Sequence, residues 1–178
     1  MRIISGKWGG RRIQPPAKMP HTRPTTDIAK EGLFNILQNR IDFTGIHTLD
    51  LFGGTGCISY ELASRGAGQL TIIEKDPVMF AFIRKNLDSL GIPDARLLKM
   101  DVFQYLASCT ETFHLVFAGP PYALGTIDEL PRIILQQKLV KPGGFFILEH
   151  TPRNQYENFE GFCFVRNYGS TLFSFFAP

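Results

Sequence analysis

Apolar residues along this chain alternate between short continuous runs and stretches in which they recur at helical spacing. Such runs are typical of strands buried on both faces of a sheet, and the wider spacing is typical of amphipathic helices. The runs cover residues 46–52, 69–74, 96–100, 113–118 and 145–150. Because strands joined by helical crossovers pair in parallel, the pattern predicts an α/β fold with helices on both faces of a parallel sheet.

Capping residues mark the ends of two predicted helices. Residues 25–27, Thr-Thr-Asp, are good N-caps, and they precede a helix whose apolar positions are Ile28, Leu33, Ile36 and Leu37. Asp76 before Pro77 predicts an N-cap followed by proline at the first helical position, and Gly91 predicts the end of that helix. The apolar face of this second helix consists of Phe80, Ile83, Leu87 and Leu90.

The end of the chain departs from this alternation. Two further strand patterns cover residues 162–166 and 171–176, and only residues 167–170 separate them. A connection that short forms an antiparallel hairpin. We therefore expect a three-layer, Rossmann-like α/β domain whose mostly parallel sheet closes with a C-terminal antiparallel hairpin. A chain of 178 residues is long enough for one such domain with a sizeable core.

Charge divides the chain unevenly, although the net charge is only +3. No acidic residue comes before Asp27, whereas the preceding segment carries Arg2, Lys7, Arg11, Arg12, Lys18 and Arg23. A basic block on a nearly balanced remainder suggests an acidic partner, most simply nucleic acid, and a solvated basic tail is the alternative. We therefore divide the chain into a basic extension for nucleic-acid contact, residues 1–24, and a main domain, residues 25–178.

Composition narrows the cellular setting. Hydrophobic residues make up 44% of the chain, and no apolar run is long enough to span a membrane. The opening residues lack the apolar region of a signal peptide. Cys57, Cys109 and Cys163 form neither a metal-binding spacing nor an obvious disulfide framework. We expect no metal and a reducing, cytoplasmic environment.

A glycine-rich turn, Gly53-Gly54-Thr55-Gly56, lies between the first predicted strand and a helix predicted over residues 57–65. Glycines let the backbone turn tightly and approach a ligand, and the helix N-terminus offers free N–H donors. Ligands bind at this carboxyl edge of open α/β sheets, so the turn indicates a ligand site. A purely steric need for glycine is the alternative. The dinucleotide fingerprint is incomplete, because Ser59 stands where its third glycine should be.

Two acidic residues follow the next predicted strands. Glu74 ends the second strand, where a carboxylate can accept hydrogen bonds from two ribose hydroxyls, and a solvated strand end is the alternative. Asp101 follows the third strand. It could accept from an adenine amino group or cap a short helix over residues 102–106, and the sequence leaves both open.

The fourth predicted strand leads into Gly119-Pro120-Pro121-Tyr122. The two prolines fix the backbone and remove two N–H donors, so carbonyls in this loop are free to accept from a substrate amine. Tyr122 offers a ring on which a base can stack. A rigid surface turn is the alternative, but the position at the end of a central strand favours a functional loop.

The whole chain resembles the small-subunit ribosomal RNA guanine-N2 methyltransferases of the RsmD type. Residues 2–12 are similar to the basic opening hairpin of that family, and residues 21–37 to its signature before the first sheet strand. Residues 50–56 resemble its cofactor loop, residues 64–67 the end of the next helix, and residues 168–169 its closing hairpin. The N-terminal signature is specific to this family, whereas many methyltransferases share the glycine loop.

The resemblance implies a class I methyltransferase that transfers a methyl group from S-adenosylmethionine to the N2 amine of a guanine in ribosomal RNA. In that family pattern, Asp50 and residues 54–56 would border the methionine moiety, Glu74 the ribose and Asp101 the adenine. Thr25 would close over the cofactor. The full set implied to bind the cofactor is Thr25, Asp50, Gly53, Gly54, Thr55, Gly56, Glu74, Asp101 and Val102.

The resemblance also implies how RNA is bound. The target base would meet a catalytic loop made of Gly119, Pro120, Pro121 and Tyr122. Other RNA contacts would come from Lys7, Trp8, Arg11, Arg12 and Arg23. The expected partner is small-subunit ribosomal RNA or the assembling small-subunit particle, bound by a monomer away from membranes.

One residue departs from the family pattern. The family carries an acidic residue before the two prolines, whereas this chain has Gly119, which offers no side chain to the target amine. Glu149, at the end of the fifth predicted strand, is the nearest other carboxylate by topology. A catalytically weakened or inactive RNA-binding or ribosome-assembly protein on the same fold is therefore the alternative hypothesis.

Two other enzyme classes are disfavoured. The incomplete glycine fingerprint and the Pro-Pro-Tyr loop count against a nicotinamide-dependent oxidoreductase. The loop alone does not exclude a methyltransferase for DNA or protein amines, but the basic extension and the N-terminal signature favour RNA.

Overall fold

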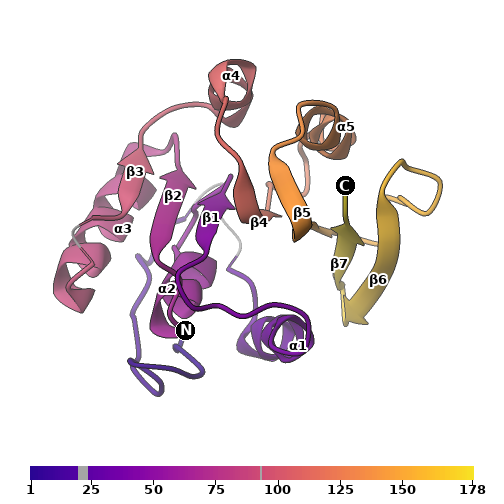
Figure 1. Cartoon of the computed structure of the whole chain (residues 1–178). Coiled ribbons are helices and arrows are strands. Elements are labelled where there is room, and N and C mark those ends of the chain that lie inside the picture. The colour runs from indigo at the N-terminus through magenta and orange to yellow at the C-terminus, as the bar shows by residue number, and fades with distance from the viewer. Residues whose placement is uncertain (20–23, 93) are drawn as a thin grey trace.

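The computed structural model describes residues 1–19, 24–92 and 94–178. Over these residues seven strands form one sheet in the order β3-β2-β1-β4-β5-β7-β6 (Figure 1). The strands are β1 His47–Asp50, β2 Gln69–Ile73, β3 Arg96–Leu98, β4 Phe113–Ala118, β5 Val140–His150, β6 Phe162–Tyr168 and β7 Thr171–Phe176. β1 to β5 pair in parallel, and β7 pairs antiparallel with both β5 and β6. This confirms the predicted sheet and its closing hairpin.

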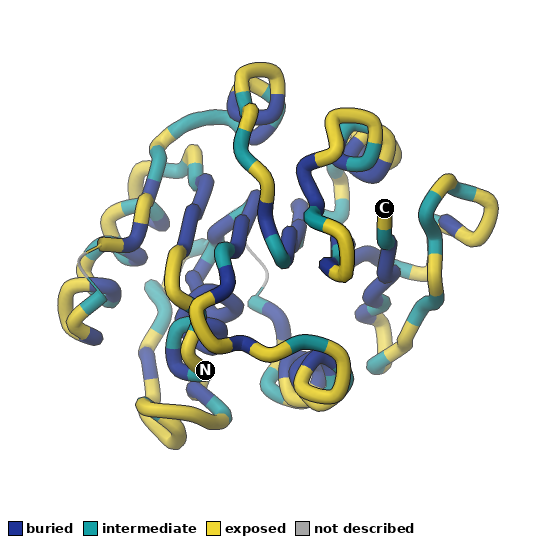
Figure 2. Tube along the Cα trace, viewed as in Figure 1, coloured by how far each residue is buried: buried dark blue, intermediate teal, exposed yellow. Residues whose placement is uncertain are grey.

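Helices cover both faces of the sheet. They are α1 Asp27–Leu37, α2 Cys57–Ser64, α3 Pro77–Leu90, α4 Val102–Ser108 and α5 Glu129–Gln136. Side chains of α1, α2 and α3 pack in one apolar cluster, and those of α4 and α5 pack in another. Successive strand residues point to opposite faces, so Phe117 joins the first cluster and Val116 the second. Figure 2 shows the central strands buried along most of their length between these layers, whereas the edge strand β6 is intermediate to exposed.

The predicted capping residues set the helix boundaries. The Thr26 hydroxyl accepts a hydrogen bond from the backbone N–H of Ala29 at the start of α1. The Asp76 carboxylate caps α3 ahead of Pro77, and α3 ends at Gly91 in the left-handed region, with φ of 70°. Asp101 caps α4 in the same way as Asp76 caps α3. Side-chain oxygens at these positions satisfy helix N–H groups that have no intrahelical partner.

The structure corrects three details of the predicted elements. Ile28 is 77% exposed, because the buried stripe of α1 is formed by Ala29, Lys30, Leu33, Phe34 and Leu37 and position 28 lies off it. β5 begins at Val140 and includes a Pro-Gly-Gly stretch. Its pairing with β4 shifts register between Phe113 and Leu115, so Phe113 pairs with Val140 and Leu115 pairs with Phe145. β6 extends to Tyr168, so the closing turn is only two residues long.

The N-terminal extension folds back on itself and packs on the domain. Arg2 and Arg12 form an isolated antiparallel bridge, and the Ile3 N–H donates to the Arg11 carbonyl at 2.9 Å. Ile3 and Ile13 are buried in the same apolar cluster as α1 and α2. The basic side chains therefore project from an anchored hairpin over the described residues 1–13.

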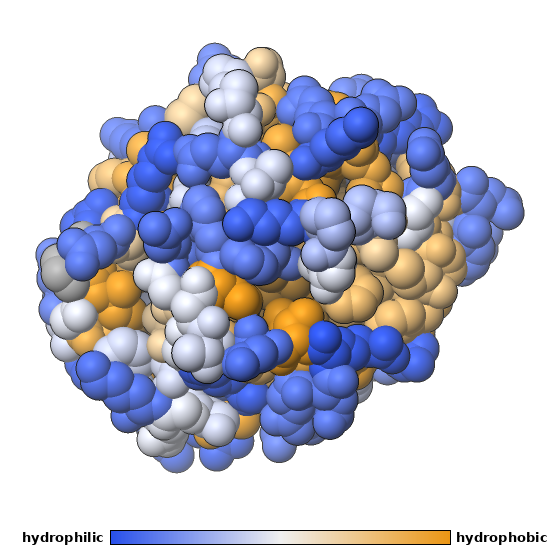
Figure 3. All heavy atoms as spheres, viewed as in Figure 1, coloured by the Kyte–Doolittle hydropathy of each residue, from blue (hydrophilic) through white to orange (hydrophobic). Residues whose placement is uncertain are grey.

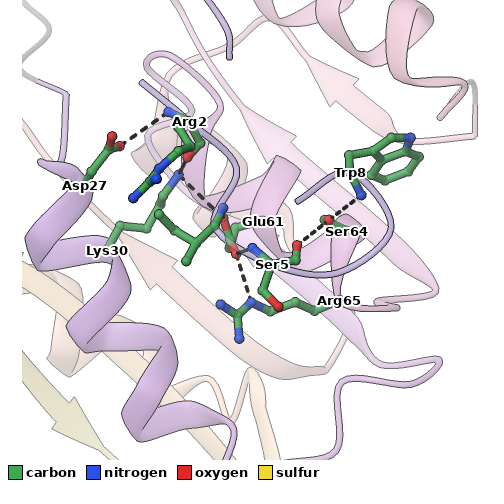
Figure 4. Close-up of polar contacts among 9 residues, drawn as sticks. Arg2, Ser5, Trp8, Asp27, Lys30, Glu61, Ser64 and Arg65 are labelled. Carbon is green, nitrogen blue, oxygen red and sulfur yellow. Dashed lines mark hydrogen bonds and ion pairs between the residues drawn. The ribbon is translucent and has the colours of Figure 1, made fainter. Parts of the chain in front are cut away.

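A buried carboxylate holds this hairpin on α2 (Figure 4). Glu61 is fully buried and accepts hydrogen bonds from the backbone N–H groups of Ile4 and Ser5, at 2.8 and 3.1 Å. Its oxygens also lie 3.5 Å from the Lys30 ammonium and 2.9 Å from Arg65 Nε. The Lys30 ammonium also donates to the Arg2 carbonyl. One residue of α2 thus joins the hairpin, α1 and the end of its own helix.

The surface in view is mainly hydrophilic. Polar and charged residues cover most of it in the space-filling view, and apolar residues show between them (Figure 3). Among the described residues, no helix combines the length and the apolar character needed to cross a membrane.

Candidate active site

The acidic and glycine-rich residues singled out in the sequence lie at the carboxyl edge of the parallel strands. β1 ends at Asp50, and Glu74 and Gly119 follow directly after β2 and β4. Glu149 is the penultimate residue of β5. Because β2, β1, β4 and β5 are consecutive parallel neighbours, their carboxyl ends share one edge of the sheet. Ligands bind at this edge in open α/β sheets.

Glu74 holds the glycine-rich turn from the neighbouring strand. One carboxylate oxygen accepts from the Gly54 N–H and the other from the Asp76 N–H, both at 2.7 Å. Burial raises the pKa of Glu74, and the N–H groups of Asp76 and Gly54 oppose that rise. Gly56 begins α2 with φ of 78°, and a Cβ there would lie 2.4 Å from the Tyr60 ring. The turn therefore requires glycine at this position for steric reasons as well.

Asp50 is a buried carboxylate beside this turn. Its Oδ2 atom accepts from the Ser59 hydroxyl at 2.8 Å, whereas Oδ1 has no hydrogen-bond partner among the residues that the structure describes. Burial raises the pKa of Asp50 to about 7, and the hydrogen bond from Ser59 opposes that rise. A buried acceptor without a donor is costly, so an arriving amine or ammonium group would be bound strongly here. Ser59, which replaces the expected third glycine, thus orients this carboxylate.

Asp101 has a structural role in this structure. Its Oδ1 atom accepts from the N–H groups of Phe103 and Gln104, at 2.8 and 3.4 Å, and its Oδ2 lies 3.8 Å from the Lys75 ammonium. The helix-cap alternative is therefore confirmed. The adenine contact expected of Asp101 and Val102 stays a prediction, and the Val102 side chain is buried in the apolar cluster below α4.

The Gly-Pro-Pro-Tyr loop meets the end of β5 and the segment before α1. The Tyr122 hydroxyl donates to Glu149 Oε1 at 3.1 Å, and the Thr25 hydroxyl donates to Glu149 Oε2 at 2.6 Å. Thr171, at the start of β7, adds its hydroxyl 3.4 Å from that of Tyr122. Burial raises the pKa of Glu149, and the hydrogen bonds from Thr25 and Tyr122 oppose that rise. Residues from four distant segments thus form one polar cluster.

The sequence predicts some residues of this cluster and its loop as site residues, but not all of them. Thr25 is predicted as a cofactor contact, and the structure places its hydroxyl on Glu149 instead; a further contact with the cofactor stays a prediction. Pro120 is buried and Pro121 is exposed, as in a loop that turns out from the sheet. Thr171 is not predicted at all, because only the antiparallel return of β7 beside β5 brings it to this edge.

The basic residues of the hairpin differ in their surroundings. Lys7, Arg11 and Arg12 are exposed, and the Arg11 guanidinium donates to the Ser89 hydroxyl at 2.6 Å. Trp8 packs partly buried against the apolar cluster, with the Lys7 ammonium 4.9 Å from its ring centroid. Trp8 therefore helps to anchor the hairpin, and its role as a stacking platform for RNA stays a prediction. Arg23 lies outside the described residues.

An open groove of about 630 Å³ runs between α1 and the closing hairpin. It is lined by Gly32, Asn35, Ile36, Asn39, Arg40, Arg166 and Tyr168. The guanidinium groups of Arg40 and Arg166 lie 4.6 and 4.7 Å from the centroid of the Phe164 ring. Gly32 allows the Tyr168 ring to approach α1 closely, because a Cβ there would lie 2.2 Å from it. No sequence pattern indicated this surface, since its residues come from opposite ends of the chain.

A family model described as Conserved hypothetical protein 95 matches residues 1–177. The chain belongs to this family. This family member is 36% identical over 134 residues to Ribosomal RNA small subunit methyltransferase D of Escherichia coli K12, a match that covers 75% of this chain and 66% of that protein. The match thus spans slightly less than two thirds of the relative. A protein of the same name from Haemophilus influenzae is 29% identical over 153 residues, with 84% and 78% of the two chains covered.

Solved structures extend this comparison to the fold of the family member. A hypothetical protein of Thermus thermophilus superposes with a TM-score of 0.86 at 28% identity, covering 100% of this chain and 99% of that one. An RNA methyltransferase of Salinibacter ruber, solved with S-adenosyl-L-homocysteine, superposes with a TM-score of 0.67 at 16% identity over 86% and 92% of the two chains. The latter similarity concerns the fold alone, and it confirms the predicted three-layer, Rossmann-like fold.

Proposed function

We propose that this protein transfers a methyl group from S-adenosylmethionine to the N2 amine of a guanine in small-subunit ribosomal RNA. The observation that carries the proposal is the buried Asp50 carboxylate with an unpartnered oxygen, among the described residues, beside the glycine-rich turn. Such an acceptor fits the ammonium group of a methionine moiety, because a charge-assisted hydrogen bond there would satisfy both groups. The names of the E. coli and H. influenzae relatives support ribosomal RNA as the substrate.

In this proposal, different residues around the turn bind different parts of the cofactor. When bound, S-adenosylmethionine supplies a methyl group activated by a sulfonium. Asp50 would hold the ammonium, and the turn from Gly53 to Gly56 would place backbone next to the methionine moiety. Glu74 would accept from ribose hydroxyls through the lone pairs that Gly54 and Asp76 leave free. The loop with Pro120 and Tyr122 would receive the target base.

The RNA partner is supported by the distribution of charge. Exposed Lys7, Arg11 and Arg12 project from an anchored hairpin, and Arg40 and Arg166 add two cations along the groove. Such cations bind phosphates largely without regard to base sequence. The alternative, a catalytically weakened or inactive ribosome-assembly protein, is favoured by Gly119 alone.

The direct test is an assay of methyl transfer. Small-subunit particles assembled with unmodified transcribed RNA are incubated with the protein and S-adenosylmethionine labelled in the methyl group. We expect label in the RNA, at the N2 position of one guanine after nucleoside analysis. Binding of particles and cofactor without any incorporated label would favour the assembly-protein alternative.

Replacing Glu74 with Ala should weaken binding of S-adenosylmethionine by about tenfold or more. The change removes an acceptor for the ribose and frees the Gly54 N–H that positions the turn. Hydrogen bonds to a charged group contribute about 1.5–3 kcal/mol each, which sets this scale. Calorimetric titration measures the effect, and Glu111→Ala on the exposed surface serves as a control. An unchanged affinity in Glu74→Ala would exclude the assigned role.

Removing three cations from the hairpin should flatten the salt dependence of RNA binding. Lys7, Arg11 and Arg12 are replaced together by Ala, and the slope of log affinity against log salt should fall by roughly 0.7–0.9 for each phosphate that is no longer neutralised. The paired control replaces the exposed Arg132 and Lys138, in and just after α5. Cofactor affinity should stay the same in both variants. Equal slopes in wild type and the triple variant would leave the hairpin as a solvated surface.

A further inference from the structure

Gly119 leaves a space that another element of the protein fills. A Cβ built on Gly119 would lie 3.5 Å from Glu149 Oε2 and 3.1 Å from the Phe117 ring. A carboxylate from β5 therefore reaches the neighbourhood in which a side chain at position 119 would begin. The backbone of Gly119 does not occupy the left-handed region, so its conformation does not itself demand glycine.

The surroundings of Glu149 hold this carboxylate in place as an acceptor. The Thr25 hydroxyl donates to Oε2 and the Tyr122 hydroxyl to Oε1, so each oxygen retains a lone pair for another donor. Glu149 is 4% exposed, and neither hydroxyl carries a positive charge that would neutralise it. A preorganised carboxylate in a dry site stabilises developing positive charge far better than one in water.

We propose that Glu149 is a catalytic residue that accepts the hydrogen bond and then the proton of the target amine, in the place of the carboxylate absent at position 119. The inference rests on the methyl transfer proposed above. The lone pair of the guanine N2 atom forms a bond to the methyl carbon, while the methyl–sulfur bond breaks and its electron pair goes to the sulfur. Positive charge on N2 is relieved when its proton passes to Glu149, which leaves a neutral N-methylamine and a thioether.

The proposal gives Thr25 and Tyr122 positioning roles. Each hydroxyl holds one oxygen of the same carboxylate, and the Thr171 hydroxyl lies within hydrogen-bond distance of the Tyr122 hydroxyl. The segment before α1 is thereby tied to β5 across the site. This arrangement explains why a chain with Gly119 can keep a carboxylate for the amine.

The test combines two substitutions in the methyl-transfer assay on unmodified small-subunit particles. Glu149→Gln keeps the shape of the side chain and removes its negative charge, and the transfer rate at saturating substrates should fall by roughly 10²–10³. Adding Gly119→Asp to Glu149→Gln should raise the rate again by at least about tenfold. The introduced carboxylate would lie close to the position of the Glu149 carboxylate, because a Cβ at position 119 lies 3.5 Å from Glu149 Oε2. Calorimetric affinity for S-adenosyl-L-homocysteine and the melting temperature should change little in Glu149→Gln.

Gly119→Asp in the wild-type background provides a second measurement. There the new carboxylate would face Glu149 directly, so we expect no gain in rate. A tenfold gain would overturn the proposal, because it would show that no carboxylate serves the amine in the natural protein. Full activity in Glu149→Gln, or a deficit that Gly119→Asp does not restore, would also overturn it. A wild-type protein that transfers no label fails the proposed function itself, whatever the variants do.

Discussion

Replacing Glu61 with Ala is expected to lower the free energy of unfolding by about 3–5 kcal/mol, the range for breaking a buried ion pair by removing one partner. Glu61 and Lys30 are both essentially inaccessible to solvent, so the substitution leaves the Lys30 ammonium buried without this counterion. It also strips the acceptor from the backbone N–H groups of Ile4 and Ser5. For a domain of this size, that corresponds to a fall in Tm of roughly 6–20 °C.

Chemical denaturation and thermal melting measure this effect. Glu111→Ala is the matched control, since Glu111 also pairs with an arginine but on the exposed surface, where a pair contributes roughly 0–1 kcal/mol. Limited proteolysis should cut the N-terminal hairpin sooner in Glu61→Ala than in the control. If both variants are destabilised by the same small amount, the hairpin is not held by this cluster.

Replacing Asp50 with Asn is expected to weaken binding of S-adenosylmethionine by roughly ten- to a hundredfold, the scale of one charge-assisted hydrogen bond. The same carboxyl should make wild-type binding depend on pH. With a pKa of about 7 in the free protein, Asp50 is only partly ionised at neutral pH, and an ammonium group beside it would favour the charged form. Ionisation of Asp50 on binding should therefore release protons, and the affinity of wild type relative to Asp50→Asn should rise by up to about tenfold from pH 6 to pH 8.

Calorimetry at pH 7 in two buffers of different ionisation enthalpy measures the protons released. Asp50→Asn supplies the matched comparison, because proton exchange by all other groups stays in both titrations. A release that is the same in wild type and Asp50→Asn would show that the ammonium does not bind at Asp50. The melting temperatures of the two proteins under the same conditions exclude a fault in folding.

The raised pKa of Asp50 also affects stability without cofactor. A carboxyl whose folded pKa lies above its ordinary value binds more protons folded than unfolded between about pH 4 and pH 7. Its contribution to the free energy of unfolding therefore falls as pH rises through that window. Burial also raises the pKa of Glu74 and of Glu149, so their contributions to the free energy of unfolding change with pH in the same sense. Asp50→Asn should thus be more stable than wild type at pH 8 while it binds cofactor less well.

The sequence by itself determined the parallel sheet and several helix ends of this protein. Alternation of apolar runs with helical spacing predicts the parallel sheet, because burial on both faces selects continuous apolar strands. Thr26, Asp76 and Gly91 set helix ends through hydrogen bonds and backbone conformations that involve only near neighbours in the chain. The order of parallel strands then brings Asp50 and Glu74 to one edge, as the sequence predicts.

Contacts between distant segments were decided only by the tertiary structure. Whether the basic extension is free or anchored depends on which partners come within hydrogen-bond distance after folding. Glu61 attracts no notice in the sequence, since its importance comes from burial against Lys30 and the hairpin. The absence of a side chain at Gly119 is visible in the sequence, but the presence of the Glu149 carboxylate beside it follows from the packing of β4 against β5. Residue order therefore determines what depends on neighbours along the chain, and the fold determines what depends on burial and on groups far apart in it.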